Sequence, residues 1–199
     1  MEKFKPITAS AVPIPIKDVD TDMILPAQFM TSVSRDGYGV NLFTRLKTGD
    51  PNFPMNHKKY DDAKIMIAES NFGCGSSREH AVWALTGAGF KVVIAKSFAD
   101  IFYNNSAKNG LLLITFDEAT VDKFLHQATE GRLELSVDLE SQTVKAGSET
   151  LKFDYDPFRK HCLLNGVDDL DYILSKSEKI KSFRERTKDT KFYSPVIPQ

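Results

Sequence analysis

Residues 71–80 form the stretch that most constrains the fold of this chain. They read Asn-Phe-Gly-Cys-Gly-Ser-Ser-Arg-Glu-His. An apolar run of strand length, 63–68, precedes them, and residues 81–90 carry apolar side chains at helical spacing. The pattern predicts a strand-to-helix turn, in which Gly73 and Gly75 let the backbone bend sharply and approach a ligand closely.

The second half of this stretch predicts a helix start and an anion site. Glu79 follows Ser76 by three residues, as in a capping box, so we expect a helix over 76–88. Its N-terminus would present unpaired N–H groups, and Arg78 adds a forked cation. Capping alone could explain a serine here. Two glycines, two adjacent hydroxyls, an arginine and a histidine exceed what a cap needs, so the expected ligand is a carboxylate or phosphate.

Composition excludes several classes of protein. The 199 residues include 26 basic and 27 acidic side chains, a net charge of -1 that gives no field for nucleic acid. The two cysteines, Cys74 and Cys162, lie far apart, so neither a zinc site nor a disulfide framework is expected. With no signal sequence and no run of 18 apolar residues, a single cytoplasmic domain spanning 1–199 is the prediction.

The middle of the chain predicts an alternating α/β fold. Continuously apolar strands are expected at 63–68, 91–95 and 111–116, and helices at 76–88, at 98–108 with Ser97 as cap, and from Asp117 to Gly131. Such strands are typical of a buried parallel sheet. Period-two alternation then predicts antiparallel hairpins between Leu133 and Phe153, and helical spacing returns over 157–183. Near the start, Ala11–Ile14 reads as an edge strand, because Pro13 limits its pairing.

Two irregular segments complete the chain. Three aspartates alternate at 18–22, but Met23 stands where a calcium loop needs glycine, so the segment is either an acidic turn or a loop that presents a carboxylate. Residues 28–60 are long and irregular yet contain several aromatic side chains, which predicts an ordered flap over a site. Arg35 lies near its tip. The last residues, 187–199, are expected to be frayed or bound to a partner.

Four motifs together resemble one known family. They are the turn at 71–80, Asp-Thr-Asp-Met-Ile at 20–24, Ala-Lys-Ser-Phe-Ala-Asp-Ile-Phe at 95–102 and His-Cys-Leu-Leu-Asn-Gly at 161–166. The chain resembles the small subunits of 3-isopropylmalate dehydratase, also called isopropylmalate isomerase, which are relatives of the swivelling C-terminal domain of aconitase. The resemblance implies a three-layer β/β/α swivelling-domain fold. It also implies isomerisation of 2-isopropylmalate to 3-isopropylmalate by dehydration and rehydration, in leucine biosynthesis.

The resemblance also implies roles for five residues. Ser76 would be the base, acting as an alkoxide that is favoured by backbone N–H groups and a guanidinium, and Ser77 would donate to the substrate or intermediate. Arg78 would bind a substrate carboxylate through two hydrogen bonds. Asp22 would be an orienting or proton-relaying carboxylate, and Arg35 a substrate-binding loop residue.

The family's cofactor implies a partner. The family uses a [4Fe-4S] cluster with three cysteine ligands, which two cysteines cannot supply. The resemblance therefore places the cluster on a separate large subunit and predicts that this chain alone is inactive and binds no metal or cofactor. Small subunits of homoaconitase or citramalate dehydratase are the nearest alternatives. A phosphate- or nucleotide-binding module is a more distant one, since the turn matches neither the Rossmann nor the Walker pattern.

Overall fold

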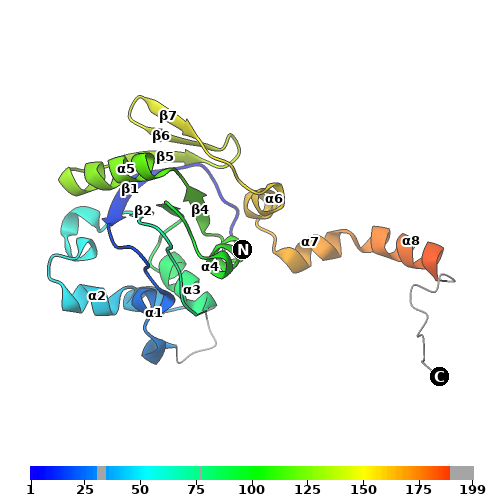
Figure 1. The fold of residues 1–199 in the computed structure, drawn as a ribbon. Coiled ribbons are helices and arrows are strands. Elements are labelled where there is room, and N and C mark those ends of the chain that lie inside the picture. Colours follow the sequence, from blue (N-terminus) through cyan, green and yellow to red (C-terminus); the bar gives the residue numbers. More distant parts are fainter. Residues whose placement is uncertain (31–34, 77, 189–199) are drawn as a thin grey trace, which may run out of the picture.

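The computed structural model describes residues 1–30, 35–76 and 78–188, and its centre is one mixed sheet (Figure 1). The strands lie in the order β4-β3-β2-β1-β5-β6-β7. They are β1 (Ile7–Ile14), β2 (Ile65–Ala68), β3 (Val92–Ala95), β4 (Leu112–Thr115), β5 (Glu134–Asp138), β6 (Thr143–Ala146) and β7 (Glu149–Lys152). Strands β1 to β4 are parallel, and β5 to β7 pair antiparallel. The expected buried parallel strands and antiparallel hairpins are confirmed.

The parallel strands carry a separate core on each face. Met66 and Ala68 of β2 point into a core shared with α3 (Glu79–Gly87) and α4 (Asp100–Lys108). Ile65 and Ile67 point the other way, onto α5 (Glu118–Glu130) and the inward side chains of β5 and β6. One layer holds α3 and α4, the next the parallel strands, and the third α5 with the antiparallel strands, and the α/β class is confirmed.

Strand β1 is central rather than an edge, so the prediction from Pro13 was wrong. Its first half pairs with β5 and its second half with β2. The Ala11 N–H donates to the Leu133 carbonyl just before β5, at 2.9 Å. The nitrogen of Pro13, two residues on, faces the same side, where β5 has not yet begun. The proline therefore removes no hydrogen bond from the sheet.

The segment 28–60 is built from short helical pieces. They are η1 (Ala27–Phe29), η2 (Tyr38–Asn41), α2 (Thr44–Gly49), η3 (Pro54–Asn56) and η4 (Lys58–Tyr60); residues 31–34 lie outside the described residues. Phe43 and Phe53 are buried against each other, with ring centroids 5.6 Å apart. These aromatic side chains fix the segment to the core.

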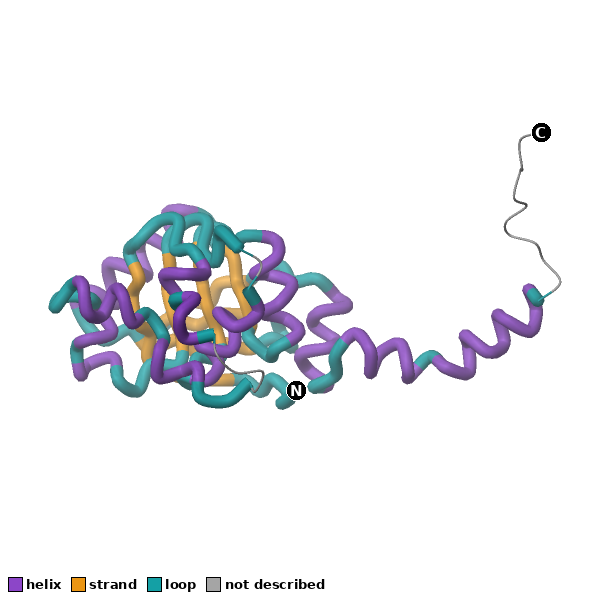
Figure 2. Tube along the Cα trace, turned by 90° about the horizontal axis from the view of Figure 1, so that it is seen from below, coloured by secondary structure: helices purple, strands orange, loops and turns teal. Residues whose placement is uncertain are grey.

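The C-terminal helices leave the body of the molecule. Helix α6 (Pro157–Asn165) buries Leu163, whereas α7 (Asp169–Ser175) and α8 (Ser177–Thr187) extend outward in both views (Figures 1 and 2). Leu170, Ile173 and Leu174 of α7 remain exposed. The predicted helices are present, but the apolar stripe that predicted them is buried only in α6. The expected frayed tail falls mostly on residues 189–199, which lie outside the described residues.

This contrast predicts different costs for two leucine-to-alanine changes. Leu163 is fully buried, so Leu163→Ala should lower the free energy of unfolding by about 2–5 kcal/mol. Leu170 is 63% exposed, so Leu170→Ala should change it by less than about 0.5 kcal/mol. Urea denaturation measures both values, and a matching loss for Leu170→Ala would show that α7 packs on the body.

Within the described residues, none of the helices combines the length and the apolar character that crossing a membrane requires.

Candidate functional site

The turn after β2 lies at the carboxyl end of the parallel strands, where open α/β sheets bind their ligands. Gly73 and Gly75 adopt φ values of +80° and +84°, which residues other than glycine rarely adopt. A Cβ on Gly73 would lie 2.2 Å from Cγ of Phe102 in α4. The turn therefore needs glycine at this position for both backbone and steric reasons.

Backbone hydrogen bonds hold the turn on two sides. On one side the Gly73 N–H donates to the Val19 carbonyl at 2.7 Å, and the Thr21 N–H donates to the Cys74 carbonyl at 3.0 Å. On the other, the Phe72 N–H donates to the Ser97 carbonyl at 3.1 Å. These partners follow β1 and β3, so the carboxyl ends of three neighbouring strands together determine the shape of the turn.

The predicted capping box at Ser76 is wrong. Helix α3 begins at Glu79, and its N-cap is Arg78, which has extended backbone and makes no capping hydrogen bond with its side chain. The Ser76 carbonyl accepts a hydrogen bond from Thr21 Oγ1 at 3.1 Å, which ties this part of the turn to the segment after β1. Ser76 therefore lies outside the helix, in an exposed loop.

The cap predicted for the next helix is also wrong. Helix α4 begins at Asp100 with Ala99 as N-cap. The Ser97 hydroxyl instead accepts a hydrogen bond from the Asn71 N–H at 2.8 Å. Its side chain supports the turn rather than a helix, because the competing donor comes from a segment distant in sequence.

Asp22 and Arg78 are in direct contact. Asp22 lies in the short helix α1 (Thr21–Ile24), and its Oδ1 accepts hydrogen bonds from Arg78 Nη1 and from the Ala27 N–H, each at 3.1 Å. Oδ2 pairs with Arg45 of α2. Asp22 thus ties the turn to both α1 and α2.

The carboxylate of Asp22 is held in its ionised form. The Ala27 N–H is the main cause that keeps the Asp22 pKa below its usual range, and Arg78 and Arg45 add to it against the opposing effect of burial. A carboxyl group with a lowered pKa accepts hydrogen bonds at neutral pH and is a poor proton donor. This favours the orienting role over the proton-relaying one.

The remaining predicted residues lie beside the turn or outside the described chain. The Arg35 guanidinium stacks on Trp83 of α3, 5.5 Å from the ring centroid. That ring contacts His80 at 4.5 Å, which places Arg35 over the first turns of α3. Ser77 lies outside the described residues.

Comparison with known proteins decides the family. The sequence profile of the aconitase C-terminal domain matches residues 1–119. The 3-isopropylmalate dehydratase small subunit of Francisella tularensis subsp. novicida is 52% identical over 93% of this chain and 98% of its own length. That of Teredinibacter turnerae is 45% identical over 96% and 95%. The chain belongs to the family of 3-isopropylmalate dehydratase small subunits. The resemblance inferred from its motifs is confirmed.

A solved member of the family has the same fold. The 3-isopropylmalate dehydratase structure from Methanocaldococcus jannaschii is 29% identical, covers 90% of this chain and 99% of its own, and superposes with a TM-score of 0.66. The swivelling-domain fold expected from the sequence is therefore confirmed.

The cysteines of the present chain do not fit an iron–sulfur cluster. Cys74 Sγ lies 3.4 Å from the Asp18 carbonyl, and Cys162 is buried in α6. Burial raises the pKa of both thiols, with nearby aspartates adding to the effect, whereas a cluster needs three thiolates. In the described part of the chain, no group of three or more His, Cys, Asp and Glu side chains could hold a metal ion.

Sequence reasoning missed two residues of the site. Thr21 supplies both a backbone and a hydroxyl donor to the turn, and Arg45 reaches Asp22 from α2. Thr21 stands within the Asp-Thr-Asp-Met-Ile motif, so its place beside the turn could have been suspected. Arg45 gave no signal, since a charged residue in an irregular segment is normally solvated.

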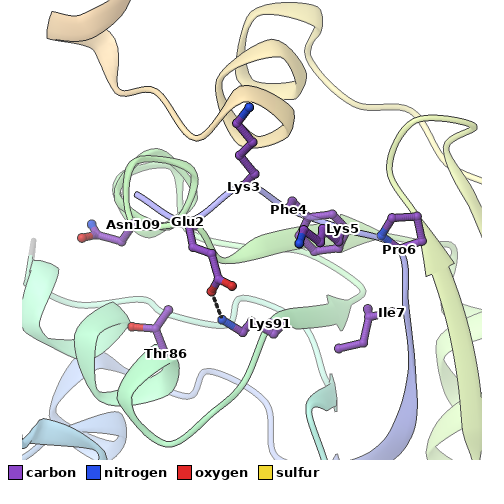
Figure 3. A pocket seen from close by; sticks show the side chains of 10 residues that line it. Glu2, Lys3, Phe4, Lys5, Pro6, Ile7, Thr86, Lys91 and Asn109 are labelled. Carbon is purple, nitrogen blue, oxygen red and sulfur yellow. Dashed lines mark hydrogen bonds and ion pairs between the residues drawn. The ribbon is translucent and has the colours of Figure 1, made fainter.

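A cavity of about 210 Å³ lies at the amino ends of the parallel strands, opposite the turn (Figure 3). Its lining includes Ile7 at the start of β1 and Lys91 just before β3. Lys91 Nζ forms an ion pair with Glu2 Oε2 at 2.9 Å. Ile7 and Lys91 mark the amino ends of the strands, whereas the turn lies at their carboxyl ends. The cavity is therefore separate from the candidate site.

Proposed function

We propose that this chain is the small subunit of a 3-isopropylmalate dehydratase, a hydro-lyase. The assembled enzyme would convert 2-isopropylmalate to 3-isopropylmalate in leucine biosynthesis, by removing water and adding it back. The observation that carries the proposal is 52% identity to a small subunit of that name across 98% of its length. The turn at 71–80 lies at the carboxyl ends of the parallel strands and carries Ser76 and Arg78, to which the reaction is assigned below.

Arg78 is the proposed carboxylate-binding residue. A hydroxydicarboxylate substrate needs fixed cations, and a guanidinium binds a carboxylate through two parallel hydrogen bonds. Arg78 contacts Asp22 through Nη1, one of the three guanidinium nitrogen atoms that carry the five N–H donors of Arg78. Asp22 therefore orients Arg78 without using up its hydrogen-bonding capacity.

Ser76 is the proposed base. The reaction requires removal of a proton from the carbon next to a carboxylate, and Ser76 is exposed two residues before Arg78. Since α3 begins only at Glu79, its N-terminal N–H groups lie beyond Ser76, and we assign stabilisation of the serine anion to the Arg78 guanidinium, two residues along the chain. Ser77 would donate a hydrogen bond to the substrate or intermediate.

Residues 28–60 are proposed to act as a flap over this site. Arg35 and Arg45 both come from this segment, and both contact elements that surround the turn. Arg35 would bind the substrate from the flap. The single-domain reading of residues 1–199 is part of the same proposal.

A large subunit is the proposed owner of the [4Fe-4S] cluster. The small-subunit names of the relatives imply such a partner, and the cysteines of this chain do not fit the cluster. The cluster would supply the Lewis acid of the dehydration. Two cysteines without a disulfide fit a reducing compartment, and we place the enzyme in the cytoplasm.

The test is activity with and without the partner. The purified chain alone should show no isomerase turnover, and mixing it with the large subunit from the same host should produce conversion of 2-isopropylmalate. Turnover by the isolated chain would contradict the proposed division of roles. A substrate panel separates the alternatives, because faster turnover of homoaconitate or citramalate would reassign the enzyme. Titration with ATP and NAD tests the nucleotide-binding reading.

A further inference from the structure

Two guanidinium groups share one carboxylate beside the turn. Asp22 comes from α1, Arg45 from α2 and Arg78 from the residue before α3. Arg78 Nη1 donates to Oδ1 at 3.1 Å, and Arg45 Nη1 pairs with Oδ2. Two positive charges and one negative charge leave the group with a net charge of +1.

We propose that Arg45 is a positioning residue, which keeps Arg78 available to a substrate carboxylate by occupying the second oxygen of Asp22. The inference rests on the proposed function and adds a residue to its substrate-binding machinery. Arg45 is 58% exposed, against 27% for Arg78, so it lies at the rim and acts through Asp22.

The geometry explains why the second oxygen matters. An aspartate facing a single arginine can form two parallel hydrogen bonds with it, the strongest arrangement of this pair. Here Arg45 holds Oδ2 and the Ala27 N–H shares Oδ1, so Arg78 makes one contact with Asp22. If a neutral residue replaced Arg45, both carboxylate oxygens of Asp22 could turn to Arg78. The substrate would then have to displace Asp22 before it could bind.

The test uses the steady-state kinetics of the reassembled enzyme. Arg45→Gln should raise KM about five- to tenfold and leave kcat within about twofold, because only substrate binding competes with Asp22. Arg45→Lys should restore most of the wild-type KM, since it keeps a cation at Oδ2. In an Asp22→Asn background, Arg45→Gln should have no further effect on KM.

A matched control comes from a distant ion pair. Arg132 and Asp62 pair elsewhere on the surface, and Arg132 is 57% exposed, so Arg132→Gln should leave KM unchanged. An unchanged KM in Arg45→Gln, or an effect that persists undiminished in Asp22→Asn, would overturn the inference. Equal melting temperatures of the variants exclude loss of folding as the cause.

A second readout separates this inference from the proposed function. NMR titration of the isolated chain should show a higher Asp22 pKa in Arg45→Gln than in wild type, because a neighbouring cation is lost. An unchanged pKa would contradict the shared charge even if the enzyme is an isomerase. Absence of isomerase turnover in the wild-type pair would instead refute the proposed function and leave the titration as the test of the charge sharing.

Discussion

Replacing Ser76 by alanine should lower the kcat of the reassembled enzyme by about 10²- to 10⁴-fold, the range for losing a general base. The free energy of unfolding should change by less than about 0.5 kcal/mol, because Ser76 is exposed and lies outside α3, so no helix cap is lost. Isomerase kinetics and urea denaturation of the same preparation measure both effects.

Ser148→Ala is the matched control for this change. Ser148 is another exposed serine, in the turn between β6 and β7, far along the chain from the candidate site. Its replacement should alter neither kcat nor stability. A Ser76→Ala enzyme with wild-type kcat would remove Ser76 from the chemistry, whatever the rest of the site does.

Among glycine-to-alanine changes in the turn, Gly73→Ala should lower the free energy of unfolding the most. The φ of +80° costs an L-residue about 1–2 kcal/mol, and a Cβ 2.2 Å from the Phe102 ring forces that ring or the turn to move, for about 1–3 kcal/mol more. We therefore expect a loss of about 2–5 kcal/mol in the free energy of unfolding. Activity with the large subunit should also fall, because the turn carries Ser76 and Arg78.

Gly37→Ala separates the two causes. Gly37 has a similar φ of +85°, but a Cβ there meets nothing within 4 Å. Its replacement should therefore cost only the backbone strain, about 1–2 kcal/mol. Equal losses for the two variants would mean that Phe102 moves aside at no cost and that the turn is less tightly packed than the structure indicates.

Local patterns were enough to predict most of the framework. Runs of apolar residues at 63–68, 91–95 and 111–116 predicted the buried parallel strands, since both faces of each strand had to be covered. Asp117 caps α5 through the Thr120 N–H at 2.9 Å, and Gly131 follows the end of that helix, as expected. The cap predicted at Ser97 failed because a donor from a distant segment, the Asn71 N–H, binds its hydroxyl instead.

The α/β alternation and the glycine turn that carries Ser76 and Arg78 follow from residues close together in the chain, so both could be predicted from local patterns. The start of α3, the tolerance of Pro13 in a central strand and the carboxylate that contacts Arg78 emerge only from the folded chain. Hydrogen bonds from distant segments, such as those of Thr21 and Arg45, compete with local preferences, and their partners are fixed only when the strands pack together.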